Sequence, residues 1–524
     1  MITAVRIKNL RSLADTGYIS IKPITLLLGA NSSGKSTFLR SFPLFTQSVS
    51  KNLRGPISWF DDSLVDFGDY DTALNKYAEN DETIQFEYII KFPFTERLWR
   101  HVLRSYDLRL IEGVEEIKFS FSLKNDAKGT YINSVSATIN DINICISVPD
   151  RQGKVLFEVN DQVIETNQIV RWDERSYSNI LPTFVFVRKD EDIMSRISIG
   201  RVMHDNIFDF VRKRSDKRLR NFGRVDDFVE GWINNKNEYL LWLKKYSPIT
   251  SFRNYVCKWE PNSPEYLELF NMIALEKFLP LWDLFDTDLS MFYTGCSYIA
   301  PTRAEANRYY RTQGLQTSDI DPFGKNLPEF ISSLTPKMAF SYNLYTKRVL
   351  GVNVKTKTEA GHQSIMVSND NGEFNITDIG FGYSQILPVV TKIWYTSNYR
   401  SGRFNRRMLG SMREEIDNII LMEQPELHLH PAYQAKIADA FINSVKGNPE
   451  SETTLRLIVE THSDTILNRI GRRVREGEIS PDDVSIVLFD KGIEDKVTRI
   501  RQTTYNAKGQ IMEWPYGFFD PLEE

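Results

Sequence analysis

Cysteine is scarce in this chain, and long hydrophobic runs are missing from it. The three cysteines among 524 residues, Cys145, Cys257 and Cys296, stand far apart, so neither a disulfide framework nor a C-x-x-C zinc site is indicated. No apolar run approaches the roughly 18–20 residues that a membrane-spanning helix needs. Residues 1–8 lack the apolar core of a signal peptide. We therefore expect a cytoplasmic protein with no membrane partner.

Neither sign of charge is in excess. The chain has 65 basic and 69 acidic residues and a net charge of −4, so composition gives no argument for general nucleic-acid binding. One local stretch is basic, and it either contacts nucleic acid or an acidic partner, or forms a solvated helix face balanced by nearby aspartates. We favour the solvated face and leave nucleic acid as an open partner. The stretch comprises Arg212, Lys213, Arg214, Lys217, Arg218, Arg220 and Arg224.

The hydrophobic pattern divides the chain into three parts. Apolar residues alternate with mostly polar ones between about Ile84 and Val159, which predicts an antiparallel meander. From about Asp190 to Phe285 the period lengthens to that of amphipathic helices. Strand-like runs then alternate with helical stretches, as in a parallel sheet. We predict an α/β fold with lobe I over 1–180, a helical insertion over 181–295 and lobe II over 296–524.

The segment Gly29–Ser36 is a complete G-x-x-x-x-G-K-[ST] motif between a buried strand and a helix, the context that a phosphate-binding loop needs. Glycines let the backbone curl so that successive N–H groups face a phosphate. Lys35 adds positive charge near the β- and γ-phosphates, Ser36 offers a hydroxyl to Mg²⁺, and the helix N-terminus favours the same anion. We predict ATP and Mg²⁺ as cofactors, bound by Gly29, Asn31, Ser32, Ser33, Gly34, Lys35, Ser36 and Thr37.

Two further strands end in polar residues that suit the same site. Ile419–Met422 is followed by Glu423, a candidate Mg²⁺ ligand beside the loop, although a solvated glutamate at a strand end is the alternative. Leu457–Val459 leads to His462, which can donate to the γ-phosphate or position the attacking water. The small-residue run from Asp378 to Gln385 opens a helix and includes Ser384, a candidate anion ligand that is a weak signal alone.

Together these pieces resemble the ABC-type ATPases of the SMC and RecF group, and within it the bacterial OLD-like ATPases. The resemblance covers residues 1–50 and about 295–524. It is carried by the strand exit Asn9–Leu13, the signature-like Gly382–Gln385, the Walker B and D-loop run Glu423–Pro431, the switch-histidine run Glu460–Ser463, the Y-x-x-P-x-R element Tyr298–Arg303, and the tail elements Gly509–Gln510 and Trp514–Asp520. It implies an ABC-ATPase head, with a P-loop sheet, helices and an antiparallel β lobe.

The resemblance also implies how the chain works. Two chains dimerise head to tail, and ATP on Lys35 and Ser36 of one chain is capped by Ser384 of the other. One residue departs from the usual pattern, because Gln424 stands where a glutamate normally polarises the attacking water. An amide cannot accept the proton, so we expect slow hydrolysis, with Glu426 or His462 as partial substitutes. Gln47 is a possible Q-loop residue, but a helix-surface glutamine is the preferred interpretation.

Three functions remain open at this point. The first is a bacterial anti-phage ATPase, similar to the Septu-type and PARIS-type proteins, that holds and releases a separate effector such as a nuclease. The second is a RecF-like DNA-repair ATPase, and the third, disfavoured by the long insertions, is a transporter's ATPase subunit. About 60 residues follow His462, too few for the ~100-residue nuclease domain of OLD enzymes, so we expect no nuclease activity in this chain.

Overall fold

The computed structural model describes residues 1–51, 53–78, 82–91, 114–151, 153–166, 169–177, 179–187, 194–195, 199–215, 235–279, 281–311, 317, 319–399, 418–446, 455–491 and 497–513. Its contacts group into two compact units. The first comprises Met1–Asn9, Ser48–Ser58 and Glu79–Ser290, and the second comprises Leu10–Gln47, Trp59–Ala78 and Met291–Glu524. The antiparallel segment and the helical segment thus share one unit, while the three-part division stays a prediction. No helix in these ranges is long and apolar enough to span a membrane.

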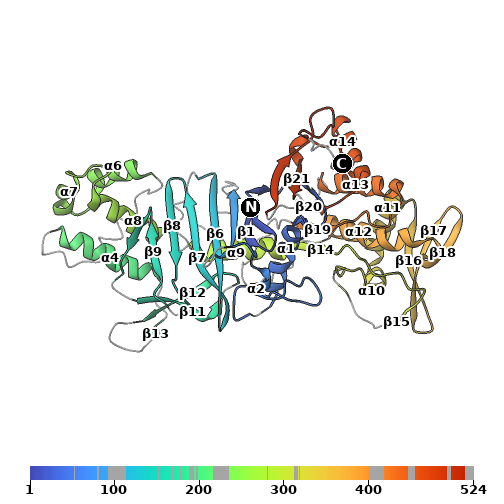
Figure 1. Cartoon of the computed structure of the whole chain (residues 1–524), viewed down its shortest axis with the longest axis horizontal. Helices are drawn as coiled ribbons and strands as arrows, with labels where there is room; N and C mark the ends of the chain where they lie inside the picture. The colour runs from blue at the N-terminus through green and yellow to red at the C-terminus, as the bar shows by residue number, and fades with distance from the viewer. Residues whose placement is uncertain are drawn as a thin grey trace. The chain divides into compact units, whose positions relative to one another are not determined.

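The first unit is built on an antiparallel sheet in the order β10-β9-β8-β7-β6-β5-β1. Figure 1 shows β6 to β9 side by side. The alternation predicted between Ile84 and Val159 is confirmed, since the buried residues of β5 are Ile84, Phe86, Tyr88 and Ile90. The strands are β1 (Ile2–Leu10), β5 (Ile84–Lys91), β6 (Glu116–Asp126), β7 (Gly129–Ile139), β8 (Ile142–Ser147), β9 (Leu156–Val159) and β10 (Gln162–Ile164).

Helices make up most of the rest of this unit, so the predicted helical insertion is confirmed. They are α4 (Ile199–Lys213), α6 (Lys236–Tyr246), α7 (Thr250–Val256), α8 (Pro264–Phe278) and α9 (Leu281–Thr294), the last of which runs on into the second unit. A small antiparallel sheet precedes them, formed by β11 (Ile169–Tyr177), β12 (Pro182–Val187) and β13 (Met194–Ser195). The strands β12 and β13 both lie within 181–295, where the sequence predicted a helical insertion. Asp286 of α9 is buried and accepts the backbone N–H groups of Ile180 and Leu181.

The second unit contains the sheet that the P-loop motif requires. Its order is β14-β19-β20-β4-β21-β22, in which β14 to β21 are parallel and β22 is antiparallel to β21. Every residue of β4, β19 and β20 is buried, as in the centre of a sheet covered on both faces. The strands are β4 (Ile24–Gly29), β14 (Cys296–Ile299), β19 (Asn418–Glu423), β20 (Leu455–Glu460), β21 (Val484–Asp490) and β22 (Arg499–Thr503).

Helices and a second small sheet complete this unit. α12, α13 and α14 lie next to one another in Figure 1, and α13 contacts both its helical neighbours and β20. The helices are α1 (Lys35–Val49), α2 (Tyr70–Ala73), α10 (Leu327–Ser332), α11 (Pro336–Leu350), α12 (Phe381–Asn398), α13 (Pro431–Val445) and α14 (Asp464–Arg475), with the 3₁₀ turns η1 (Ile376–Asp378) and η2 (Pro481–Asp483). The second small sheet consists of β15 (Tyr310–Arg311), β16 (Asn353–Glu359), β17 (His362–Asn369) and β18 (Gly372–Asn375). Two short strands, β2 (Leu13–Asp15) and β3 (Ile19–Ser20), precede β4 in the chain.

Two glycines explain how the C-terminal part packs on α14. A Cβ built on Gly471 would lie 2.3 Å from the carbonyl oxygen of Gly509, and one built on Gly509 would lie 1.9 Å from that of Gly471. The backbones therefore touch, and only glycine fits at either position. Tyr505 secures the contact, because its hydroxyl donates to the carbonyl of Leu467. The α/β fold class, with a P-loop sheet, an antiparallel lobe and a helical insertion, is confirmed.

Candidate active site

The loop Gly29–Ser36 joins β4 to α1 and closes around its own lysine. Gly29 has a φ of +157° and Gly34 a φ of +102°, conformations that side chains rarely adopt. Packing adds a second constraint, since a Cβ on Gly29 would lie 2.4 Å from the carbonyl oxygen of Phe489 and one on Gly34 would lie 2.6 Å from Leu13. The strand exit Asn9–Leu13 thus supports the loop directly through Leu13.

Lys35 is held inside this loop. Its Nζ donates to the carbonyls of Gly29 and Ala30 at 2.9 and 2.8 Å, and its side chain is 3% exposed. Burial lowers the pKa of Lys35, and the charge of Glu460 offsets part of that effect. The ammonium therefore already points into the curl of the loop, where phosphate oxygens would replace the two carbonyls as its acceptors.

Ser36 pairs with an acid to which the sequence assigned no role. Its hydroxyl donates to Oε2 of Glu460 at 2.7 Å, and Oε1 of the same carboxyl lies 3.9 Å from Nζ of Lys35. Glu460 ends β20 as Glu423 ends β19, and the parallel register places the two directly opposite each other. The signal was present in the sequence, because both acids close a run of apolar residues.

Glu423 is held by other partners. Arg40 of α1 donates Nε and Nη2 to its two oxygens, each at 2.7 Å, and the Tyr298 hydroxyl donates to Oε1 at 2.7 Å. The side chain of Glu423 is 3% exposed, whereas that of Arg40 is 35% exposed. The structure thus places Glu423 beside the loop helix but pairs Ser36 with Glu460, and the metal role of Glu423 stays a prediction.

The loop after Glu423 brings the other candidate groups together. Gln424 has a φ of +43°, unusual for a residue with a side chain, and its N–H donates to the carbonyl of Glu460. Oε1 of Glu426 accepts the N–H of His462 at 2.7 Å. Among the described residues, Oε2 of Glu426 and Nε2 of His462 are both buried without a hydrogen-bond partner. Two candidate catalytic groups therefore adjoin each other, each with a free polar atom.

Burial shifts the pKa of both Glu426 and His462. It raises the pKa of Glu426, against the effects of the His462 N–H, the Thr461 hydroxyl and the charge of Arg303. It lowers the pKa of His462, and the charge of Lys35 lowers it further. The lowered pKa favours the neutral imidazole, which can donate from one ring nitrogen and accept at the other.

Ser384 lies in the first turn of α12, which begins at Phe381, just before the predicted signature run. Its hydroxyl donates to the carbonyl of Phe381 at 2.6 Å, and the residue is buried. The ring of Phe381, which is 46% exposed, and the exposed imidazole of His428 lie nearby. The centroids of these two rings are 5.4 Å apart. The capping role of Ser384 in a partner's site stays a prediction.

The other residues predicted to bind nucleotide range from exposed to buried. Asn31 and Ser32 are exposed, Thr37 is half-buried, and Ser33 is buried. His430, near the predicted D-loop position, caps α13 by accepting the N–H of Ala432. The expectation of a surface position for Gln47 was wrong, because this residue is fully buried.

Gln47 accepts the N–H of Val65 at 3.2 Å and so ties the end of α1 to that segment. In the basic stretch, Arg212 pairs with Asp209, and Arg214 pairs with Glu268 and lies over the ring of Phe210. The residues from Lys217 to Arg224 and the tail Trp514–Asp520 lie outside the described residues.

The comparisons with known proteins agree with this geometry. A family model described as "AAA domain, putative AbiEii toxin, Type IV TA system" matches residues 24–468. The chain belongs to this family. The match runs from β4 into α14 and thus includes the loop, both acids and His462. Because this is a family of P-loop ATPases, the chain belongs to that class, and nucleotide binding is implied.

Sequence searches of curated proteins give no match. Among solved structures, the chain is similar to "Crystal structure of the SmcHead bound to the C-winged helix domain of ScpA", with 12% identity over 96% of this chain and 97% of that chain and a TM-score of 0.34. It is also similar to "SMC head domain from Thermotoga maritima", with 8% identity, 95% and 98% coverage and a TM-score of 0.33. Similarity at this level carries no conclusion about ligands or partners.

The residues present fit a magnesium nucleotide. The buried Oγ of Ser33 has no hydrogen-bond partner among the described residues, as expected of a group that meets a ligand. The loop also has the close packing of a phosphate-binding turn, since a Cβ at Gly29 would meet Phe489 and one at Gly34 would meet Leu13. Ser36 supplies the hydroxyl and Glu460 and Glu423 the carboxylates that Mg²⁺ prefers.

Proposed function

We propose that this chain binds ATP with Mg²⁺, hydrolyses it slowly, and acts as the regulatory ATPase of a bacterial anti-phage system that holds and releases a separate effector such as a nuclease. One observation carries the ATPase part. At the carboxyl ends of the neighbouring strands β4, β20 and β19 lie the loop lysine, Glu460 and Glu423, with His462 and Glu426 joined beside them. Ligands of parallel sheets bind at this edge.

The chain's own groups divide the work of nucleotide binding. Lys35 exchanges two carbonyl acceptors for phosphate oxygens, a stronger interaction because the acceptors are then charged. The hydroxyl of Ser36 and the adjacent carboxylate of Glu460 would hold Mg²⁺, whose charge neutralises phosphate oxygens when it is bound. Arg40 keeps Glu423 fixed next to this pair.

Slow hydrolysis follows from the groups available to accept a proton. The amide of Gln424 cannot act as a base, and Glu426 is the carboxyl next in line. Burial raises the pKa of Glu426, the direction that makes its carboxylate a stronger base, and its bond to the His462 backbone fixes its orientation. His462, whose lowered pKa favours the neutral imidazole, would align the attacking water through its free Nε2.

Assembly is part of the proposal. The exposed Phe381 and His428 lie at the start of α12 and in the loop after β19, next to Ser384. We propose that this face meets the nucleotide of a second copy, so that ATP joins two chains into at least a dimer. The Ser384 hydroxyl would then exchange the Phe381 carbonyl for a phosphate oxygen.

The defence role is supported by two observations. The family description names a putative AbiEii toxin of a type IV toxin–antitoxin system. The motifs of the sequence resemble those of defence-system ATPases. In the described part of the basic stretch, Arg212 and Arg214 already pair with acidic residues of the chain.

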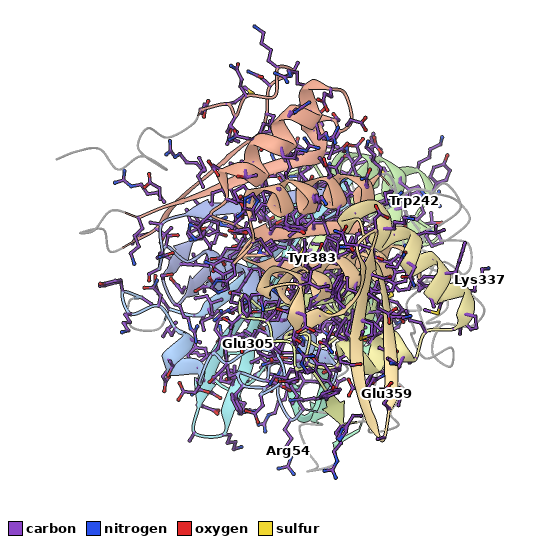
Figure 2. All side chains as sticks on the ribbon, turned by 90° about the vertical axis from the view of Figure 1, so that its right-hand side faces the viewer. Arg54, Trp242, Glu305, Lys337, Glu359 and Tyr383 are labelled. Carbon is purple, nitrogen blue, oxygen red and sulfur yellow. The ribbon has the colours of Figure 1, made fainter. Side chains whose placement is uncertain are left out.

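The test combines chemistry and biology in one set of variants. Lys35→Ala should abolish phosphate release by the purified chain and protection of cells against phage when the chain is expressed with its gene neighbours. Lys337→Ala is the matched control, because it removes an exposed lysine of α11 that lies away from the loop in sequence and on the surface in Figure 2. Full protection by Lys35→Ala would contradict the proposal, and salt-sensitive, ATP-dependent DNA binding by the isolated chain would support a DNA-repair function instead.

A further inference from the structure

The segment from Tyr298 to Arg303 connects three parts of the active site, and nothing above assigns a role to its arginine. Tyr298 lies in β14 and bonds Glu423, while Arg303 lies four residues beyond the end of that strand. Arg303 is 2% exposed, an unusual position for an arginine unless it is paired.

The guanidinium holds the loop that carries Gln424 and Glu426. Nη2 of Arg303 donates to the carbonyl of Pro425 at 3.4 Å, and Nη1 donates to the carbonyl of Ala300 at 3.3 Å. The backbone carbonyl of Arg303 accepts the side-chain amide of Gln385 at 3.4 Å. Gln385 directly follows Ser384 and is itself buried. One residue thus joins the first turns of α12 to the loop after β19.

Arg303 also supplies a charge that faces Glu426. Its Nε and the Oε2 of Glu426 are both buried, and neither has a hydrogen-bond partner among the described residues. The two groups attract each other: Glu426 raises the pKa of Arg303, which burial lowers to about 10, and Arg303 lowers the pKa of Glu426, which burial raises. Among the described residues, His462 contributes its backbone N–H to Glu426, and Thr461 contributes a hydroxyl.

We propose that Arg303 is a positioning residue for hydrolysis: it fixes the loop that carries Glu426, supplies the positive charge opposite its carboxyl, and ties both to the start of α12. The inference rests on the proposed function, because it assumes that Glu426 accepts the proton from water. A displacement of the first turn of α12, where a second copy would dock, would therefore move Arg303 and change the basicity of the Glu426 carboxylate.

The experiment measures steady-state phosphate release as a function of pH for Arg303→Met and Arg303→Lys. Arg303→Met removes the charge but keeps much of the side-chain volume. Without the positive charge, the acidic limb of the kcat profile should move to higher pH by about one unit, since an opposite charge commonly shifts a carboxyl pKa by about 1–3 units. The KM for ATP should stay unchanged, because the hydrogen bonds of Arg303 among the described residues go to Ala300, Pro425 and Gln385 and not to the phosphate-binding loop. Arg303→Lys should restore the position of the limb while kcat stays reduced.

Two further variants make the result specific. Lys392→Met also removes a buried cation of this unit, one paired with Asp319, and should leave the pH profile unchanged. In a Glu426→Gln background, Arg303→Met should produce no additional shift of the limb, because the carboxyl on which it acts is gone.

The outcomes separate the two proposals. A wild-type chain with no ATP hydrolysis contradicts the proposed function. A wild-type chain that hydrolyses ATP, together with an Arg303→Met variant of lower kcat and unchanged pH profile, overturns the inference and leaves Arg303 as a structural support. If Arg303→Met does not fold, Arg303→Lys decides: a kcat equal to that of the wild type overturns the positioning role.

Discussion

The ion pair between Arg40 and Glu423 holds a buried carboxyl beside the phosphate-binding loop through two hydrogen bonds. Arg40→Met removes two charge-assisted bonds of 2.7 Å from a carboxyl that is 3% exposed and leaves only the Tyr298 hydroxyl as its partner. Removing one partner of a buried pair commonly costs about 3–5 kcal/mol. The Arg40 side chain is 35% exposed, so water reaches the gap and we expect a loss of about 2 kcal/mol.

Urea unfolding followed by tryptophan fluorescence measures this loss, because Trp394 is fully buried in the same unit. The control is Arg469→Met, which breaks a bidentate pair with Asp439 that is about one-quarter exposed on both sides and leaves Arg473 as a second partner. The control should cost under about 1 kcal/mol. Equal losses in the two variants would show that water solvates Glu423 and that Arg40 does not hold it.

Four other outcomes are expected. Gln424→Glu should accelerate phosphate release about tenfold or more, and Glu426→Gln should reduce it by roughly 10²–10⁴-fold. Unchanged phosphate release in both variants would contradict the assignment of the base. Gly471→Ala should lower the free energy of unfolding by about 1–3 kcal/mol, since its Cβ would overlap the Gly509 carbonyl, and unchanged stability would refute that contact. Burial raises the pKa of Asp286, so this residue binds protons more tightly in the folded state than in the unfolded state. The free energy of unfolding should therefore fall as the pH rises from the unfolded pKa through the folded one. Urea titrations at several pH values should show this slope in the wild type and not in Asp286→Asn. Light scattering with saturating ATP and Mg²⁺ should give at least a dimer, and a strictly monomeric mass would exclude assembly through the nucleotide.

Local sequence was enough to predict the parts of the fold whose pattern is strong. The buried strands β4, β19 and β20 each contain at least three consecutive apolar residues, and the alternating residues of β5 lie in the sheet as predicted. The sheet of β15 to β18 went unpredicted, because β16 has only one buried residue, Val354, among polar ones. Periodicity carries little signal in a strand whose faces are both largely solvated.

The pairings within the site could not be predicted from sequence. Glu423 and Glu460 end similar strands, and nothing local shows that Ser36 bonds the second while Arg40 bonds the first. These partners lie hundreds of residues apart, and the choice depends on the order of strands in the sheet. Gln47 was misplaced for a related reason, because its burial depends on a backbone group of the segment near Val65 rather than on its own helix.

The central claim is that the loop around Lys35 binds the phosphates of ATP, and the most direct measurement is the affinity of the purified chain for ATP in the presence of Mg²⁺. Titration calorimetry on the wild type and on Lys35→Ala gives that affinity without requiring turnover. The account predicts that Lys35→Ala weakens binding by about 100-fold or more, since loss of one buried charge that pairs with phosphate costs about 3 kcal/mol. Binding of ATP by Lys35→Ala with the affinity of the wild type would contradict it.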